Sequence, residues 1–290
     1  MKILVTGANG QLGMAFRHAA EDWNHQVLYT DAFVREECVD FLDITDLETV
    51  SQYLDANAPD VILNCAGYTD VERAESEEEK AYEANARAVG ILAAEAAARN
   101  ISLIHISTDY VFDGKSSVPY VEDAEPAPLS AYGRSKLAGE LALAESGCSY
   151  ILIRTSWLYS PYGKNFVKTI MAKSIELPVL KVVSDQVGSP TYAGDLVEFI
   201  MHIIDDGQLN KTGVYNYSNE GVCSWYDIAV AVCNANDSLC DVLPCRSGDY
   251  PTRAQRPHYS VLDKSKVKST FGVEIPHWAD SLSYCLAQMP

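Results

Sequence analysis

Residues 2–13 read KILVTGANGQLG. The first five form a short apolar, β-branched run, which is typical of a buried strand. Glycines follow at positions 7, 10 and 13, and residues 14–21 have a helical pattern. Glycines in such a turn let the backbone approach a pyrophosphate, which the helix N-terminus can bind. The position of the turn directly after the first strand therefore favours a dinucleotide site over a glycine-rich turn without a ligand.

The alternation of strand and helix continues through the first half of the chain. Further buried strands are expected at 26–30, 60–64, 102–107 and 150–155. Between them, residues 76–79 fit a capping box that begins at Ser76, and 82–99 has the composition of one long helix. This pattern predicts an α/β fold with a doubly wound parallel sheet of the Rossmann type.

Beyond residue 155 the alternation weakens, and prolines and glycines separate shorter elements. We therefore expect a dinucleotide-binding domain over 1–155 and a smaller α/β substrate-binding region over 156–290. Segments near 180–212 and 258–264 are expected to return to the first domain.

Composition excludes several classes of function. Of the 290 residues, 48% are hydrophobic and 21% charged, as in globular proteins, and the net charge of −18 opposes binding to nucleic acid or anionic membranes. Met1-Lys2 leads straight into the first strand, so we expect no signal peptide and a cytoplasmic protein. The eight cysteines show neither Cys-x-x-Cys nor zinc-ligand spacing with histidine, which favours free thiols and no metal.

Asp31 ends the second predicted strand, where an acidic side chain binds the adenosine ribose and repels a 2′-phosphate. This favours NADH, although Arg35 nearby keeps NADPH possible. Asp43 and Ile44 are expected to border the adenine; the alternative is that Asp43 or Asp46 caps the following helix. The expected cofactor-binding residues are Gly7, Asn9, Gly10, Gln11, Leu12, Gly13, Asp31, Asp43, Ile44, Cys65, Ala66, Gly67, Tyr132 and Lys136.

Tyr132 and Lys136 lie four residues apart in a predicted helix, so they project from one face. A lysine ammonium beside a phenol lowers the pKa of the phenol, but one lysine alone is too weak to bring it to neutrality. Thr108 ends the fifth strand, where its hydroxyl can bind a substrate carbonyl opposite Tyr132; a simple turn former is the alternative. His105 lies mid-strand between apolar neighbours and is interpreted as a core histidine.

Four further blocks occur in order, at 107–114, 154–159, 185–191 and 256–257. With the glycine-rich turn, Thr108 and Tyr132-x-x-x-Lys136, the chain resembles the extended short-chain dehydrogenase/reductase superfamily. Within that superfamily it is most similar to the dTDP-4-dehydrorhamnose reductases, over nearly its whole length. The resemblance implies NADPH- or NADH-dependent reduction of the C4 ketone of dTDP-4-dehydro-β-L-rhamnose to dTDP-L-rhamnose, the last step of dTDP-rhamnose synthesis.

The resemblance also implies roles for individual residues. Tyr132 would donate the proton, Lys136 would hold the nicotinamide ribose, and Thr108 would orient the carbonyl. Asn85 matches a position linked to a proton relay; an exposed helical asparagine is the alternative. The residues expected to contact the substrate are Val71, Thr108, Tyr110, Tyr132, Trp157, Asn165 and Arg256. Among these, Arg256 would bind the diphosphate, and core packing is the alternative for Trp157.

Rival hypotheses remain within and outside this class. A 4,6-dehydratase needs a second acid after Thr108-Asp109, where this chain has Tyr110; a 4-epimerase shares the Tyr-Lys pair. The regulatory β subunit of methionine adenosyltransferase, a non-catalytic binding partner, also resembles these reductases. Residues 14–16 carry no acid that could hold the magnesium of some family members, so no metal is predicted, and monomer and homodimer stay open.

Overall fold

A seven-stranded parallel sheet forms the centre of the molecule. The computed structural model describes residues 1–34 and 36–289, so Arg35 and its bearing on NADPH lie outside the described residues. The strands are β1 (Lys2–Thr6), β2 (Gln26–Asp31), β3 (Asp40–Phe41), β4 (Val61–Asn64), β5 (Ser102–Thr108), β6 (Tyr150–Thr155) and β11 (Gly213–Asn216). Their order is β11-β6-β5-β4-β1-β2-β3, so the chain reverses its direction of progress between β1 and β4. The predicted fold class is confirmed, and ligands are expected at this switch point, beyond the carboxyl ends of the strands.

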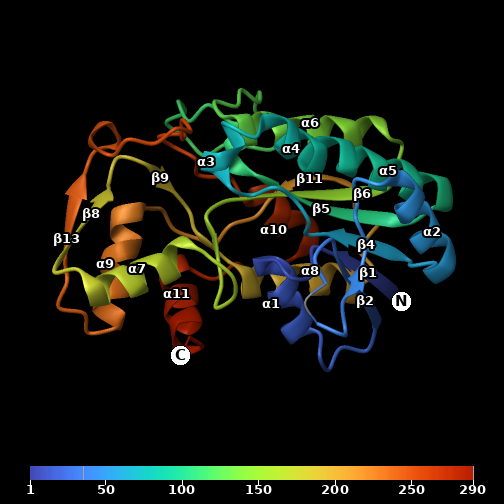
Figure 1. The fold of residues 1–290 in the computed structure, drawn as a ribbon, viewed down its shortest axis with the longest axis horizontal. Helices are drawn as coiled ribbons and strands as arrows, with labels where there is room; N and C mark the ends of the chain where they lie inside the picture. The colour runs from blue at the N-terminus through green and yellow to red at the C-terminus, as the bar shows by residue number, and fades with distance from the viewer. Residues whose placement is uncertain (35, 290) are drawn as a thin grey trace.

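Helices cover both faces of the sheet (Figure 1). On one face lie α2 (Leu47–Asn57), α4 (Glu78–Tyr82), α5 (Ala88–Arg99) and α6 (Ala131–Glu145). On the other lie α1 (Gln11–Ala19) and α8 (Ala193–Asp205). Side chains alternate between the faces: Ile3 and Val5 enter the cluster under α1 and α8, whereas Leu4 enters the cluster under α2 and α5.

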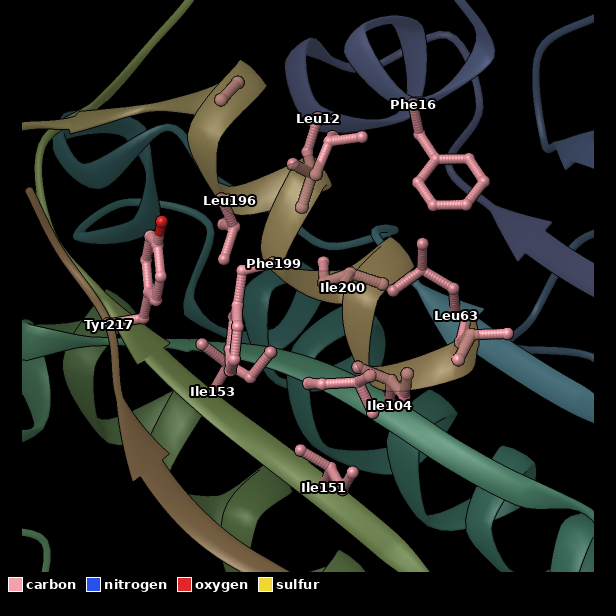
Figure 2. Packing of buried hydrophobic residues seen from close by; sticks show 14 of the residues in the cluster. Leu12, Phe16, Leu63, Ile104, Ile151, Ile153, Leu196, Phe199, Ile200 and Tyr217 are labelled. Carbon is pink, nitrogen blue, oxygen red and sulfur yellow. The ribbon is translucent and has the colours of Figure 1, made fainter. Parts of the chain in front are cut away.

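Figure 2 shows the cluster that fixes α8 to the sheet. Leu12 and Phe16 of α1 lie beside Leu196 and Ile200 of α8, above apolar residues of the central strands. Burial of each such side chain contributes about 1.5–3 kcal/mol. The second half of the chain therefore completes the core of the first.

The predicted helix over 82–99 is interrupted. The structure has α4, then a π-helical turn over Glu83–Arg87, then α5. The prediction that Ser76 caps this helix is wrong: the N-cap is Glu77, and the Ser76 hydroxyl donates to the carbonyl of Arg73. That carbonyl lies in α3 (Val71–Ala74), a short helix that sequence patterns did not reveal.

A smaller region with its own apolar cluster lies beside the sheet (Figure 1). Its helices are α7 (Phe166–Glu176), α9 (Trp225–Ala235) and α11 (Trp278–Ala287). Its strands are β7 (Leu158–Tyr159), β8 (Val179–Val183), β9 (Val187–Gly188), β10 (Thr191–Tyr192), β12 (Cys223–Ser224) and β13 (Asp241–Cys245). Helix α10 (Ser265–Phe271) packs on the main core through Val267 and Phe271.

The chain passes between the two parts more than once. Strand β11 belongs to the main sheet and helix α8 packs on it, whereas β8 pairs with β13 in the smaller region. Leu262 forms a bridge with Tyr120 and joins a small cluster on the main part. The division at residue 155 stays a prediction. No helix among the described residues has the length and apolarity to span a membrane, and all eight cysteines are free thiols.

Candidate active site

The glycine-rich turn packs against the turn that follows β4. Gly7 has φ +68°, and a Cβ there would lie 2.6 Å from the Cα of Ala66. A Cβ on Gly13 would lie 2.3 Å from the carbonyl oxygen of Gly7. A larger residue at Gly7 would separate the first turn from the Cys65–Gly67 turn, and a larger residue at Gly13 would force α1 away from the Gly7-Ala8 backbone.

The donors and acceptors of this turn fit a dinucleotide. The N-cap of α1 is Gly10, which provides no side-chain hydrogen bond, so the first amides of the helix are left for an anion. Asp31 lies at the end of β2, where its Oδ2 accepts from the amide of Asn9 (3.0 Å) and its Oδ1 from the amide of Phe33 (2.9 Å). The carboxylate thus holds the turn in place, beside the position where an adenosine ribose would bind.

The residues expected near the adenine separate into two groups. Asp46 is the N-cap of α2, accepting from the amides of Glu48 and Thr49. Asp43 accepts from the amide of Thr45 (2.9 Å) and does not cap the helix. Ile44 buries its side chain in the core, so a nucleotide contact would use its backbone. The cofactor roles of Asp43 and Ile44 stay predictions.

Asn85 connects the two halves of the site. It is 1% exposed, so the alternative of an exposed helical asparagine is wrong. Its Oδ1 accepts from the amide of Tyr68 (2.8 Å), and its Nδ2 donates to the carbonyl of Tyr68 and to the hydroxyl of Ser135 (3.0 Å). The π-helical turn, a form often found at functional sites, carries this side chain. Ser135 lies between Tyr132 and Lys136, and its part in the site was not predicted.

Tyr132, Thr108 and Tyr110 come together at the carboxyl edge of the sheet. The rings of Tyr110 and Tyr132 meet edge to face, with centroids 5.5 Å apart. The hydroxyl of Thr108 is close enough to the Tyr132 phenol to lower its pKa. The same hydroxyl donates to Oδ1 of Asp109 (3.1 Å). Burial raises the pKa of Asp109 to about 6, against the lowering effects of Ser260 and Thr108. The Oδ2 atom of Asp109 is buried and has no hydrogen-bond partner among the described residues.

The pKa of Tyr132 differs from the expectation. Burial raises it to about 12; the Thr108 hydroxyl lowers it, and the negative charge of Asp109 raises it further. The expectation that Lys136 lowers the pKa of Tyr132 is wrong for the protein by itself, because the Lys136 ammonium contacts other groups. Its Nζ donates to the carbonyl of Ile106 (2.6 Å) and lies 3.4 Å from Nε2 of His105. Burial also lowers the pKa of Lys136 to about 8.

Arg256 lies close to the phenol of Tyr110. It lowers the pKa of Tyr110, although burial holds that pKa above its ordinary value. The Arg256 guanidinium pairs with Glu72 (2.5 Å), which also accepts from the amide of Arg253 (2.8 Å). Glu72 follows Val71 in α3, so this acid, which was not predicted, ties Arg256 to the helix that carries Val71. A cavity of about 260 Å³ adjoins Arg256. It is lined by Gln186, Ser247, Thr252, Arg253, Ala254, Gln255, Arg256 and His258.

Trp157 and Asn165 have structural partners in the smaller region. Trp157 has φ +50° and stacks on Trp225, with centroids 3.8 Å apart. A left-handed tryptophan is strained, and such strain concentrates at functional sites. Asn165 caps α7 through the amide of Lys168 and donates to Oε1 of Gln11 (3.0 Å). Gln11, expected at the cofactor, therefore also joins the two parts of the molecule.

A buried ion pair supports the helix that carries Tyr132. Arg154 of β6 binds Glu140 of α6 through Nε and Nη2, the latter at 2.7 Å. Both side chains are at most 6% exposed. The block at 154–159 signalled Arg154, but only the fold shows that its partner is Glu140. Within residues 1–34 and 36–289, no three His, Cys, Asp or Glu side chains gather as metal ligands, and the absence of a metal stays a prediction.

A Tyr-Lys pair on a helix beside a strand-end threonine, at the carboxyl edge of a Rossmann-type sheet, is the arrangement of the short-chain dehydrogenases/reductases, which are nicotinamide-dependent oxidoreductases. The chain matches, over residues 1–290, the family model described as the RmlD substrate binding domain. It belongs to this family, as its sequence motifs predicted.

Similar proteins carry the name that the motifs suggested. A dTDP-4-dehydrorhamnose reductase of Aggregatibacter actinomycetemcomitans is 38% identical, with 97% of each chain covered. The crystal structure of such a reductase from Clostridium acetobutylicum is 38% identical, with 99% of each chain covered and a TM-score of 0.92. A third, from Bacillus anthracis and solved in complex with NADP, is 35% identical, with 99% of each chain covered and a TM-score of 0.93.

Proposed function

We propose that this protein is a dTDP-4-dehydrorhamnose reductase, which reduces the C4 ketone of dTDP-4-dehydro-β-L-rhamnose with NADPH or NADH and forms dTDP-L-rhamnose. The observation that carries the proposal is the meeting of Thr108 and Tyr132 at the carboxyl edge of the sheet that bears the glycine-rich turn. Family membership and the named relatives support the choice of substrate.

Tyr132 is the proton donor in this proposal. With its pKa raised to about 12, the phenol is protonated at neutral pH and ready to donate. A nicotinamide held at the glycine-rich turn would supply the hydride for the carbonyl carbon. The Thr108 hydroxyl, which donates to Oδ1 of Asp109 in the structure, turns to donate toward the carbonyl oxygen and stabilises the negative charge that develops there. Transfer leaves a buried phenolate, which a nearby cation must stabilise, and Lys136 lies one helical turn away.

In this proposal Arg256 binds the substrate diphosphate. Its guanidinium already binds an anion, the carboxylate of Glu72, and the adjoining cavity also exposes Arg253 and His258. A bidentate guanidinium suits a diphosphate in the same way. In this proposal Val71, Tyr110 and Trp157 surround the sugar between Arg256 and Tyr132.

Cofactor choice is part of the proposal. The Asp31 carboxylate favours the free ribose hydroxyls of NADH, whereas the Bacillus anthracis relative was solved with NADP. We therefore propose that both cofactors are used. Eight free thiols suit the reducing cytoplasm, where we place the enzyme.

The test is a coupled assay with dTDP-4-dehydro-6-deoxyglucose and a 3,5-epimerase, following the absorbance first of NADPH and then of NADH. The expected result is substrate-dependent oxidation with dTDP-L-rhamnose as the product. No oxidation with either cofactor, in protein that still binds them, would contradict the proposal. A stoichiometric methionine adenosyltransferase partner in a pull-down would then favour the regulatory hypothesis.

A further inference from the structure

A chain of buried polar side chains runs from β1 across the sheet to Lys136. The Thr6 hydroxyl donates to Oδ1 of Asn64 (2.7 Å), and Nδ2 of Asn64 lies 3.0 Å from Nδ1 of His105. Nε2 of His105 then lies 3.4 Å from Nζ of Lys136. None of the four residues is more than 5% exposed. Buried polar groups of this kind must satisfy one another, so the direction of each hydrogen bond can be worked out.

The orientation of Asn64 determines where His105 carries its proton. The backbone amide of Ala66 can only donate, and it donates to Oδ1 of Asn64 (3.1 Å). The Nδ2 group of Asn64 must therefore face His105, whose Nδ1 accepts. A neutral imidazole with an accepting Nδ1 carries its hydrogen on Nε2. The ring is neutral because burial, and then the charge of Lys136, hold its pKa well below the ordinary value.

The hydrogen on Nε2 of His105 points toward Lys136. An ammonium group has only donors, whereas a neutral amine has a lone pair that can accept. We propose that His105 is a positioning residue whose Nε2–H group donates a hydrogen bond to the Lys136 amine. This hydrogen bond keeps both the amine and the ammonium form of Lys136 populated near neutral pH. The lowered pKa of Lys136, about 8, agrees with this arrangement, although burial is its main cause.

Other groups around Lys136 act differently. Glu140, one turn further along α6, favours the ammonium, but Arg154 binds that carboxylate. Tyr132, one turn earlier, is a neutral phenol, and the Cys65 thiol beyond β4 is neutral because burial raises its pKa to about 12. The negative charge of Asp109, which follows β5, raises the pKa of Tyr132. The carbonyl of Ile106 accepts from either form of Lys136, so His105 is the contact that distinguishes them.

The test follows the ionisation of Lys136 directly. Full-length protein labelled with ¹³C at lysine Cε is titrated by NMR, and the Lys136 signal is assigned by its loss in Lys136→Arg. We expect a midpoint near pH 8 in the wild type. In His105→Phe the amine loses its donor, and we expect the midpoint to rise by about one unit or more. An unchanged midpoint in His105→Phe, or a wild-type midpoint at the ordinary lysine value, would overturn the proposal.

A second measurement needs no variant. The ¹⁵N shifts of the His105 ring in the wild type report its tautomer, and we expect the proton on Nε2. A proton on Nδ1 would overturn the proposal even where His105→Phe fails to fold.

The tuning of Lys136 by His105 rests on the proposed function, yet failure of the one can be told apart from failure of the other. If Lys136 titrates as expected in a protein without reductase activity, the tuning stands and the proposed function falls. If the reductase is active, the basic limb of its kcat–pH profile should move to higher pH in His105→Phe, together with the NMR midpoint. A limb that stays in place while kcat falls would leave His105 with a purely structural role.

Discussion

At Tyr132, burial and hydrogen bonding act in opposite directions on one phenol. Burial is the larger effect and raises the pKa to about 12, although the Thr108 hydroxyl lowers it. Sequence spacing placed Tyr132 and Lys136 on one helical face, but it cannot show how deeply the face is buried. The identity of the pair was therefore predictable, whereas the sign of the pKa shift was not.

The substitution Tyr132→Phe removes the proposed proton donor. We expect kcat to fall about 10²–10⁴-fold, because general acids typically contribute that much. Cofactor affinity, measured by fluorescence titration, should stay nearly unchanged. Tyr53→Phe is the control: this hydroxyl on α2 donates to Asp40 of β3, outside the Thr108–Tyr132 site, and its loss should leave kcat unaltered. A loss below tenfold in Tyr132→Phe would remove Tyr132 from the role of proton donor.

Asp109 should make stability depend on pH. Its pKa is about 6 in the folded chain against an ordinary 3.8, so between these values the folded state binds more protons than the unfolded state. The free energy of unfolding should therefore fall as pH rises from 4 to 6, by up to roughly 3 kcal/mol. Asp109→Asn should lack this contribution. Urea unfolding at pH 4, 5, 6 and 7 checks it: the stability of the variant relative to wild type should increase across this range. A constant difference between the two proteins would show that Asp109 ionises normally.

At the scale of elements, the contact between α6 and the π-helical turn positions Asn85 beside Ser135. Gly139 makes this contact possible, since a Cβ there would lie 2.0 Å from the carbonyl oxygen of Asn85. Sequence patterns located both helical segments, but a π-turn adds a residue without changing composition. The interruption therefore depends on packing that only the folded chain provides.

Two glycine substitutions in this helical layer should have opposite effects. Gly139→Ala forces α6 away from the π-turn, and we expect it to destabilise the protein by about 1–3 kcal/mol. Gly90→Ala on α5 adds a Cβ at an ordinary 3.6 Å from Ala142, so it should stabilise by about 0.5–1 kcal/mol through helix propensity. Chemical denaturation of both variants measures the difference. Equal effects would mean that α6 can shift without cost.

At the scale of the whole molecule, Arg256 and Glu72 join the smaller region to the main sheet. Glu72 lies on α3, beside the sheet edge, while Arg256 lies near the end of the chain. Burial raises the pKa of Glu72, but the hydrogen bonds from the Arg253 amide and the Arg256 side chain outweigh burial and lower it. The carboxylate therefore stays charged across the junction where the substrate is proposed to bind.

Replacing Arg256 tests that junction. In Arg256→Gln a charged hydrogen bond to the diphosphate is lost, so we expect KM for the dTDP-sugar to rise about 10–100-fold, with a smaller change in kcat. Arg73→Gln is the matched control, because Arg73 lies next to Glu72 but pairs with Glu77 on the surface. Steady-state kinetics measure both. A fall in kcat at constant KM would contradict a binding role for Arg256.

The order of residue types along the chain determined the parallel sheet, the glycine-rich turn and the helix that carries Tyr132 and Lys136. These features depend on local periodicity and on glycines at a single turn, which a sequence displays directly. Tertiary structure alone decided the partners: Glu72 with Arg256, Glu140 with Arg154, and His105 with Lys136. It also decided the raised pKa of Tyr132 and the return of α8 to the first core. Burial and long-range pairing depend on which distant segments meet in space, and no local pattern records that.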